Sequence, residues 1–166
     1  MVKSYLTKNP SETKKLGEKL AKRILKEKLK KRAVIIGLAG ELGGGKTTFL
    51  QGFAKGLGIK EKILSPTFVI LKKFKIPNPL DAKRTPRRVA FQIPKFKHFY
   101  HIDCYRIDKP KHILDLGFKE IISFPQNIVA IEWADRIQKI MLKGTIWIKL
   151  KFINKQKRQI TIKSFK

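Results

Sequence analysis

The run Gly-Glu-Leu-Gly-Gly-Gly-Lys-Thr at residues 40–47 fits the pattern Gly-x-x-x-x-Gly-Lys-[Ser/Thr] without a mismatch. An apolar run at 33–39 comes before it and predicts a buried strand, and residues 47–54 after it predict a helix. Backbone N–H groups can surround a phosphate chain only where side chains are absent and some residues take positive φ, and glycine permits both. The sequence therefore predicts a loop that binds the phosphates of a nucleoside triphosphate.

Two side chains of this loop have predicted roles of their own. Lys46 is expected to reach the β- and γ-phosphates, and the Thr47 hydroxyl is expected to bind Mg²⁺. Such a loop contacts phosphates and not the base, so it does not distinguish ATP from GTP.

Composition limits the class of protein. The 166 residues contain 42% hydrophobic residues, which is enough for one globular domain. No apolar stretch approaches the roughly 20 residues of a membrane-spanning helix, and the start lacks a signal peptide, so a cytoplasmic protein is expected. The single cysteine, Cys104, is predicted to be a core residue.

The net charge of +27, from 39 Lys and Arg against 12 acids, has two interpretations. Attraction to nucleic acid or another polyanion is one. A lysine-rich compositional habit spread over the surface is the other.

The remaining pattern alternates strands with helices. Ser11 is predicted to cap a helix over 11–31. Helices are also expected at 113–122 and 135–142, strands at 68–71, 99–105 and 128–131, and an antiparallel hairpin at 145–150 and 159–162. This order predicts an α/β fold like that of P-loop NTPases: a three-layer sandwich with a mostly parallel sheet, helices on both faces and an antiparallel C-terminal hairpin.

Residues 72–97 interrupt the pattern within what is expected to be a single domain over 1–166. They hold four prolines and nine Lys or Arg against one acid, Asp81. A long basic loop or an extended hairpin is predicted here.

Two carboxylates are expected near the phosphate loop. Glu132 directly follows the apolar run 128–131, and Asp103 lies in the strand before it. The carboxyl ends of parallel strands meet at one edge of such a sheet, so either residue could hold Mg²⁺ or orient a water molecule. A structural ion pair with Arg106 or Arg136 is the alternative for each.

Several motifs in this order resemble the bacterial ATPase family TsaE (YjeE) of tRNA threonylcarbamoyladenosine biosynthesis. The resemblance spans nearly the whole chain. It depends on Ser-Glu-Thr at 11–13, the loop at 40–49, Ser-Pro-Thr-Phe at 65–68, Tyr-His-Ile-Asp-Cys-Tyr-Arg at 100–106, Gly-Phe-Lys-Glu at 117–120 and Ile-Glu-Trp at 131–133. The loop alone is shared by many proteins, whereas this ordered set is specific.

The resemblance implies ATP and Mg²⁺ as cofactors and a set of site residues. Phosphates would be held by Gly43, Gly44, Gly45, Lys46, Thr47 and Thr48. Thr47, Glu132 and Asp103 would bind the metal, and Lys46, Glu132 and Asp103 would be catalytic. Thr13 would lie near the base, Thr67 would belong to a loop sensing the γ-phosphate, and Trp133 would pack beside the centre.

The resemblance also implies partners. The ATPase would act with a TsaD-like carbamoyltransferase subunit and a TsaB-like subunit, without making the modified nucleoside itself. The chain departs from the family pattern at Gly44, where alanine is usual, and at 72–97, where the loop is usually short and often acidic.

Two other functions remain open from the residues. A small-molecule phosphotransferase could use Arg84, Arg87 and Arg88 as a lid over its site. A basic RNA-binding module could use Phe91, Phe96 and Phe99 for stacking, although no RNA-binding signature is present.

Overall fold

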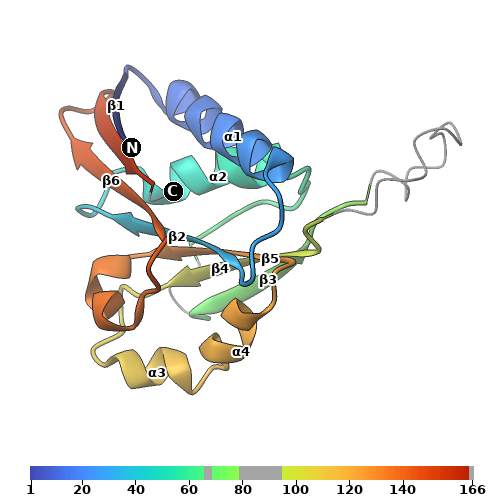
Figure 1. Cartoon of the computed structure of the whole chain (residues 1–166). Helices are drawn as coiled ribbons and strands as arrows, with labels where there is room; N and C mark the ends of the chain where they lie inside the picture. The colour runs from blue at the N-terminus through green and yellow to red at the C-terminus, as the bar shows by residue number, and fades with distance from the viewer. Residues whose placement is uncertain (66–68, 79–94, 165–166) are drawn as a thin grey trace, which may run out of the picture.

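The computed structural model describes residues 1–65, 69–78 and 95–164. In these residues apolar strands alternate with helices, and the strands form one seven-stranded sheet. The strand order is β1-β7-β6-β2-β5-β4-β3 (Figure 1). The strands are β1 (Val2–Thr7), β2 (Val34–Ala39), β3 (Leu71–Lys75), β4 (His98–Asp103), β5 (Asn127–Glu132), β6 (Ile146–Phe152) and β7 (Arg158–Lys163).

The middle of the sheet is parallel and its edges are antiparallel. β2 pairs in parallel with β5 and β6, and β5 with β4. β1 and β6 are both antiparallel to β7, and β3 is antiparallel to β4. The predicted α/β fold is confirmed, with a mixed sheet whose parallel centre carries the phosphate loop.

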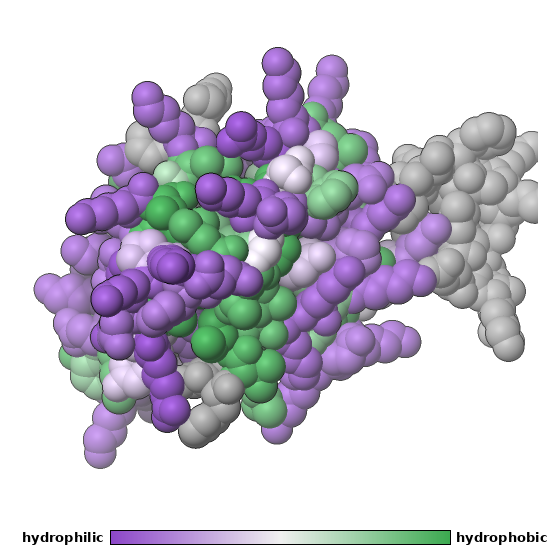
Figure 2. All heavy atoms as spheres, turned by 90° about the horizontal axis from the view of Figure 1, so that it is seen from below, coloured by the Kyte–Doolittle hydropathy of each residue, from purple (hydrophilic) through white to green (hydrophobic). Residues whose placement is uncertain are grey.

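Helices cover both faces of the sheet, as Figure 1 shows. One face packs against α1 (Pro10–Lys26) and α2 (Lys46–Gly56). The other packs against α3 (Pro110–Leu114), α4 (Phe118–Ser123) and the 3-10 helix η3 (Ala134–Ile140). Ile36 and Ile35 point to these two cores, because neighbouring strand residues alternate between faces. In Figure 2, hydrophobic residues lie in the middle of the α3–α4 side and hydrophilic side chains project around them.

The first helix begins and ends earlier than predicted. Asn9 caps it, not Ser11, and its side-chain oxygen accepts a hydrogen bond from the Glu12 N–H at 2.9 Å. The Lys8 N–H, one residue before the cap, donates in turn to the Glu12 carboxylate at 2.8 Å, which ties the incoming chain to the first turn of the helix. The helix ends at Lys26, because Glu27 has an extended backbone and the cations that follow would repel each other at i,i+4 spacing.

The structure differs from the prediction at three other places. The strand β1 was not predicted, because a short exposed strand has little apolar pattern. The strand predicted at 68–71 runs over Leu71–Lys75. The helix predicted at 113–122 is two short helices, because Gly117 takes φ +76° between them.

The basic segment begins within β3, which pairs antiparallel with β4, the strand that follows the segment. Residues 79–94, including Arg84, Arg87, Arg88 and Phe91, lie outside the described residues. No helix among the described residues is long and apolar enough to cross a membrane.

Cys104 is a core residue, as predicted, and burial raises the pKa of its thiol to about 12. Because the thiolate is the reactive form, we expect a thiol-alkylating reagent at pH 8 to label the native chain at least about a hundredfold more slowly than the urea-unfolded chain. Mass spectrometry of timed samples measures this. Equal labelling rates in the native and unfolded chains would contradict the buried position.

Candidate nucleotide-binding site

The loop at 40–45 leaves β2 and enters α2, as the sequence predicts. Its backbone depends on glycine: Gly40 takes φ +140°, Gly43 +70° and Gly45 +95°. A Cβ on Gly40 would lie 2.1 Å from the Leu150 carbonyl oxygen, whereas one on Gly43 would meet no atom within 4 Å. Gly45 is the N-cap of α2, where the first N–H groups have no partner within the helix. This arrangement suits an anion at the helix N-terminus.

Lys46 is buried beneath the loop. Its ammonium donates hydrogen bonds to the carbonyl oxygens of Gly40 and Glu41, at 2.7 and 2.8 Å, and lies 3.7 Å from the centre of the Trp133 ring. Burial lowers the pKa of Lys46, and the nearby carboxylates of Glu132 and Asp103 oppose this shift. The ammonium is thus held within the loop, beside both carboxylates.

Glu132 joins the phosphate loop to the next strands. The Thr47 hydroxyl lies 2.9 and 3.0 Å from its two carboxylate oxygens, to which it donates. His101 Nε2 lies 2.9 Å from one of the same oxygens, and both side chains are buried. The structure therefore brings together Thr47 and Glu132, which the sequence places 85 residues apart.

His101 was quoted in a motif but given no role from the sequence. The parallel register pairs it with Ala130 and pairs Asp103 with Glu132, so both side chains lie on the same face as Glu132. Among the described residues, its Nδ1 is buried without a hydrogen-bond partner. The alternation of His101 with Asp103 was the signal that could have placed it beside Glu132.

Asp103 ends β4 directly beside Glu132 in the sheet. The Ser65 hydroxyl donates to one of its carboxylate oxygens, and the Tyr105 N–H donates to the other at 2.8 Å. These bonds hold its side chain at the carboxyl edge of the sheet, within electrostatic reach of Lys46.

The other predicted residues lie around this centre. Trp133 follows Glu132 with φ +56°, and its ring packs against Lys46 and Tyr105. Arg136 lies over the Trp133 and Tyr105 rings. Thr48 lies half-buried in the first turn of α2. Thr67 falls outside the described residues.

Thr13 is connected to the loop through an arginine that the sequence did not single out. Its hydroxyl bonds that of Thr7 at 2.9 Å, and Thr7 bonds the Arg158 carbonyl oxygen. The Arg158 guanidinium donates to the Gly43 carbonyl oxygen at 3.0 Å and stacks on Phe152, 4.5 Å from the ring centre. No local pattern predicts this contact, because 115 residues separate Arg158 from Gly43.

The residues present fit Mg²⁺. This ion prefers oxygen ligands and shares them with substrate phosphates and water. The Thr47 hydroxyl and the Glu132 carboxylate supply protein oxygens directly beside the loop. No group of three or more His, Cys, Asp or Glu side chains that could hold a metal occurs over 1–65, 69–78 and 95–164.

One predicted set of residues is wrong. Phe96 and Phe99, proposed as stacking residues of an RNA-binding module, are 1% and 0% exposed. Both belong to the core beneath α1 and α2, where Phe99 packs against Phe53 and Phe74. They contact no solvent and cannot stack on bases.

Comparisons with known proteins agree on one family. A family model described as threonylcarbamoyl adenosine biosynthesis protein TsaE matches residues 7–160. The TsaE protein of Rickettsia typhi is 33% identical over 85% of this chain and 84% of its own. That of Bacillus subtilis is 32% identical over 95% of this chain and 82% of its own.

A solved structure supports the same grouping. The crystal structure of YdiB from Bacillus subtilis superimposes with a TM-score of 0.69 at 27% identity, covering 99% of this chain and 86% of YdiB. The chain belongs to the TsaE family of tRNA threonylcarbamoyladenosine biosynthesis proteins.

Proposed function

We propose that this chain is a single-domain, Mg²⁺-dependent ATPase that supports the threonylcarbamoyladenosine modification of tRNA in the cytoplasm. The observation that carries the proposal is the contact of the Thr47 hydroxyl with the Glu132 carboxylate beside the phosphate loop. A hydroxyl and a carboxylate that are hydrogen-bonded where a glycine-rich loop leads into a helix suit a nucleotide–metal complex. Family membership supports ATP as the nucleotide and tRNA modification as the process.

Each residue of the centre has a distinct proposed role. The loop amides of Gly43, Gly44 and Gly45 would hold the phosphates, and Lys46 would exchange its carbonyl contacts for phosphate oxygens. Thr47 and Glu132 would hold Mg²⁺, which, when bound, neutralises charge on the phosphates. Asp103 would support this centre through water.

The buried His101 beside Glu132 would fix the orientation of its carboxylate. His101 bonds one carboxylate oxygen from within the core, which leaves the carboxylate turned toward Thr47. Trp133 would cover the centre from the opposite side. Lys46 and both carboxylates lie in one small region. Positioning of the nucleotide and stabilisation of transition-state charge by these groups would therefore supply most of the rate enhancement.

The partners proposed for this activity are a TsaD-like and a TsaB-like subunit. A family named for its role in the biosynthesis of a modified nucleoside is part of a system with other components, which supports partner proteins. Hydrolysis in the complex would drive or reset the partners.

The proposal is tested by ATP hydrolysis with Lys46→Ala as the variant. A hydrogen bond to a charged group contributes about 1.5–3 kcal/mol, so we expect nucleotide affinity to fall by about 10- to 100-fold and turnover to fall with it. Titration with a fluorescent ATP analogue and a phosphate-release assay, with and without the two partners, measure both.

Lys55→Ala, at the exposed far end of the same helix, is the matched control and should retain wild-type values. If the unaltered chain neither binds nor hydrolyses ATP, or if Lys46→Ala behaves like wild type, the proposed function is wrong.

A further inference from the structure

A second concave site lies at the end of the sheet opposite the phosphate loop. It is a groove of about 240 Å³ at the amino-terminal ends of β2 and β6. The loop after α1 forms one wall and the loop after η3 forms the other. Its polar lining comprises Lys30, Lys31, Arg32, Lys143 and Thr145. We call this site the amino-end groove. The six residues of β2 separate it from the loop by roughly 20 Å.

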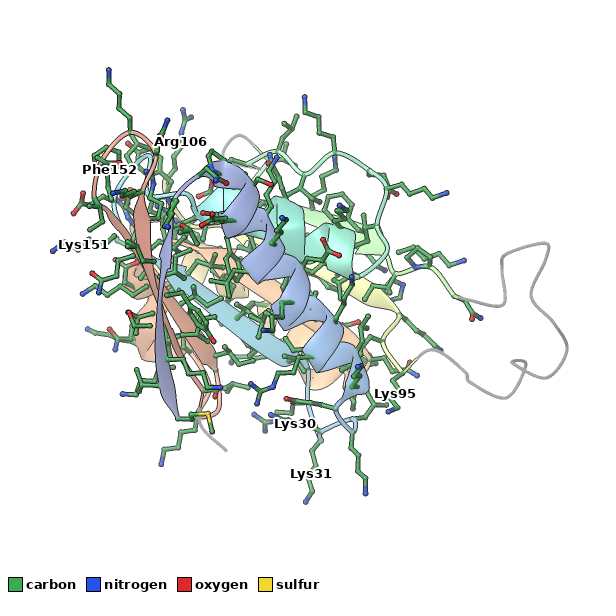
Figure 3. All side chains as sticks on the ribbon, turned by 90° about the horizontal axis from the view of Figure 1, so that it is seen from above. Lys30, Lys31, Lys95, Arg106, Lys151 and Phe152 are labelled. Carbon is green, nitrogen blue, oxygen red and sulfur yellow. The ribbon has the colours of Figure 1, made fainter. Side chains whose placement is uncertain are left out.

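The amino-end groove is strongly cationic. Its lining contains four basic residues and no carboxylate. Among the described residues, no ion pair involves Lys30, Lys31, Arg32 or Lys143. Figure 3 shows Lys30 and Lys31 extending away from the fold, far from Lys151 and Phe152. Their charges are therefore available to an external anion.

Two of the six basic residues of α1 have an acidic partner, unlike the four basic residues of the groove. Lys22 and Lys55 both pair with Glu18, at 2.5 and 3.7 Å, and Arg23 pairs with Glu27 at 3.8 Å. Acids thus lie among the cations on that face. The positive charge of the chain is not evenly spread, and the amino-end groove is a place where it is not compensated.

The positive field extends to the neighbouring strand end. The described segments 28–33, 95–98, 122–127 and 142–145 contain no acid, and they add Lys28, Lys95 and Lys97 to the cations of the groove. Burial lowers the pKa of His98 at the start of β4. The ammonium groups of Lys73, Lys97 and Lys75 lower it further, against a hydrogen bond with Asn127.

An exposed aromatic residue lies two positions along the chain from a residue that is hydrogen-bonded to the groove wall. Phe124 is 60% exposed in the turn before β5. The Ala33 N–H donates to the Ile122 carbonyl oxygen at 3.0 Å, which ties this turn to the groove wall. In a nucleic acid the phosphates bind cations and the bases stack on aromatic rings, so cations near an exposed aromatic residue suit this class of ligand. An acidic peptide would need the charges alone.

We propose that the amino-end groove binds the phosphate backbone of RNA, with Phe124 as a stacking surface for an unpaired base. The family's role in tRNA modification makes RNA the polyanion that this chain meets. Because the groove and the phosphate loop lie at opposite ends of β2, RNA and nucleotide could be bound at the same time.

The test compares two variants with the same loss of charge. The groove variant is Lys30→Gln, Lys31→Gln, Arg32→Gln, and the control is Lys14→Gln, Lys15→Gln, Lys19→Gln on the exposed face of α1. The probe is a fluorescein-labelled tRNA transcript, titrated by anisotropy at several KCl concentrations. Each phosphate contact contributes about 0.7–0.9 to the slope of log affinity against log salt.

We expect the groove variant to lose about two to three units of this slope and about tenfold or more in affinity at 0.1 M KCl. The control should lose less than about threefold, and Phe124→Ser should weaken single-stranded RNA more than duplex RNA. Equal losses in the groove variant and the control would show binding by bulk charge alone and would overturn the proposal. Polyglutamate binding as tightly as RNA would overturn it too.

Two readouts keep this result separate from folding and from ATP hydrolysis. Lysine acetylation of the unaltered chain, read by mass spectrometry with and without tRNA, should show protection at Lys30, Lys31 and Lys143, and absence of protection there contradicts the proposal. The groove variant should retain nucleotide affinity. If the unaltered chain binds RNA but does not hydrolyse ATP, the proposed function is refuted and this inference still holds.

Discussion

Glu132→Gln is expected to lower ATP turnover in the partner complex by about 10²- to 10³-fold, the usual range for removing a group that stabilises charge in the transition state. Glutamine has nearly the same shape as glutamate but is neutral, and only one of its two terminal atoms accepts hydrogen bonds. Glu132 now accepts from Thr47 at both oxygens and contacts His101 at one. The variant therefore loses the negative charge of the proposed metal ligand and one hydrogen-bond acceptor together.

The loss should appear in kcat more than in nucleotide affinity, because the loop amides and Lys46 are the groups proposed to bind the phosphates and the variant leaves them in place. Phosphate release under saturating ATP gives kcat. In a magnesium titration, the Mg²⁺ concentration that gives half-maximal activity should rise. Asp135→Asn is the matched control: it removes one exposed negative charge near Lys46 and should change kcat by less than about threefold. Turnover by Glu132→Gln above about a tenth of wild type would remove Glu132 from the catalytic role.

The phosphate loop and Glu132 could be predicted because their signals are local. An apolar run followed by glycines and Lys46 specifies a strand, a turn with positive φ and a helix within 20 residues. Glu132 directly follows an apolar run, so its place at the carboxyl edge follows from the parallel sheet. The contact between Glu132 and Thr47 then required only that β2 and β5 be neighbours, and they are.

The contacts that were missed all join segments far apart in the chain. Arg158 reaches Gly43 only because β7 folds back beside β6, and β1 finds its place only because β7 offers an edge. The hairpin of β6 with β7 was predicted from its alternating residues, whereas the pairing of β1 with β7 and the contact of Arg158 with Gly43 leave no periodic pattern in the sequence. His101 was missed for a different reason: a histidine inside an apolar strand is usually a core residue, and its alternation with Asp103 becomes informative only when Asp103 is placed beside Glu132 by the register with β5.

Gly52→Ala is expected to destabilise the fold by about 3 kcal/mol. Alanine would favour the α2 helix by about 1 kcal/mol through its intrinsic propensity. Against this, a Cβ on Gly52 would lie 1.9 Å from the Lys14 carbonyl oxygen and 2.5 Å from two further backbone atoms of Lys14. Backbone cannot move aside as a side chain does, so α1 and α2 must separate and lose packing around Phe49 and Phe53. The steric cost exceeds the propensity gain.

The close approach of α1 to α2 has a second half, which makes the prediction sharper. A Cβ on Gly17 of α1 would lie 2.2 Å from the Phe49 carbonyl oxygen, so Gly17→Ala should destabilise by a similar amount from the opposite side. Once either alanine has pushed the helices apart, the other should cost less, so the double variant should be less destabilised than the sum. Urea unfolding followed by far-UV circular dichroism measures all three, with Lys14→Ala, exposed on the same interface edge, as the control expected near wild type. An unfolding free energy for Gly52→Ala equal to or above wild type would contradict the predicted contact, and with it the packing that places the first turn of α2 beneath the phosphate loop.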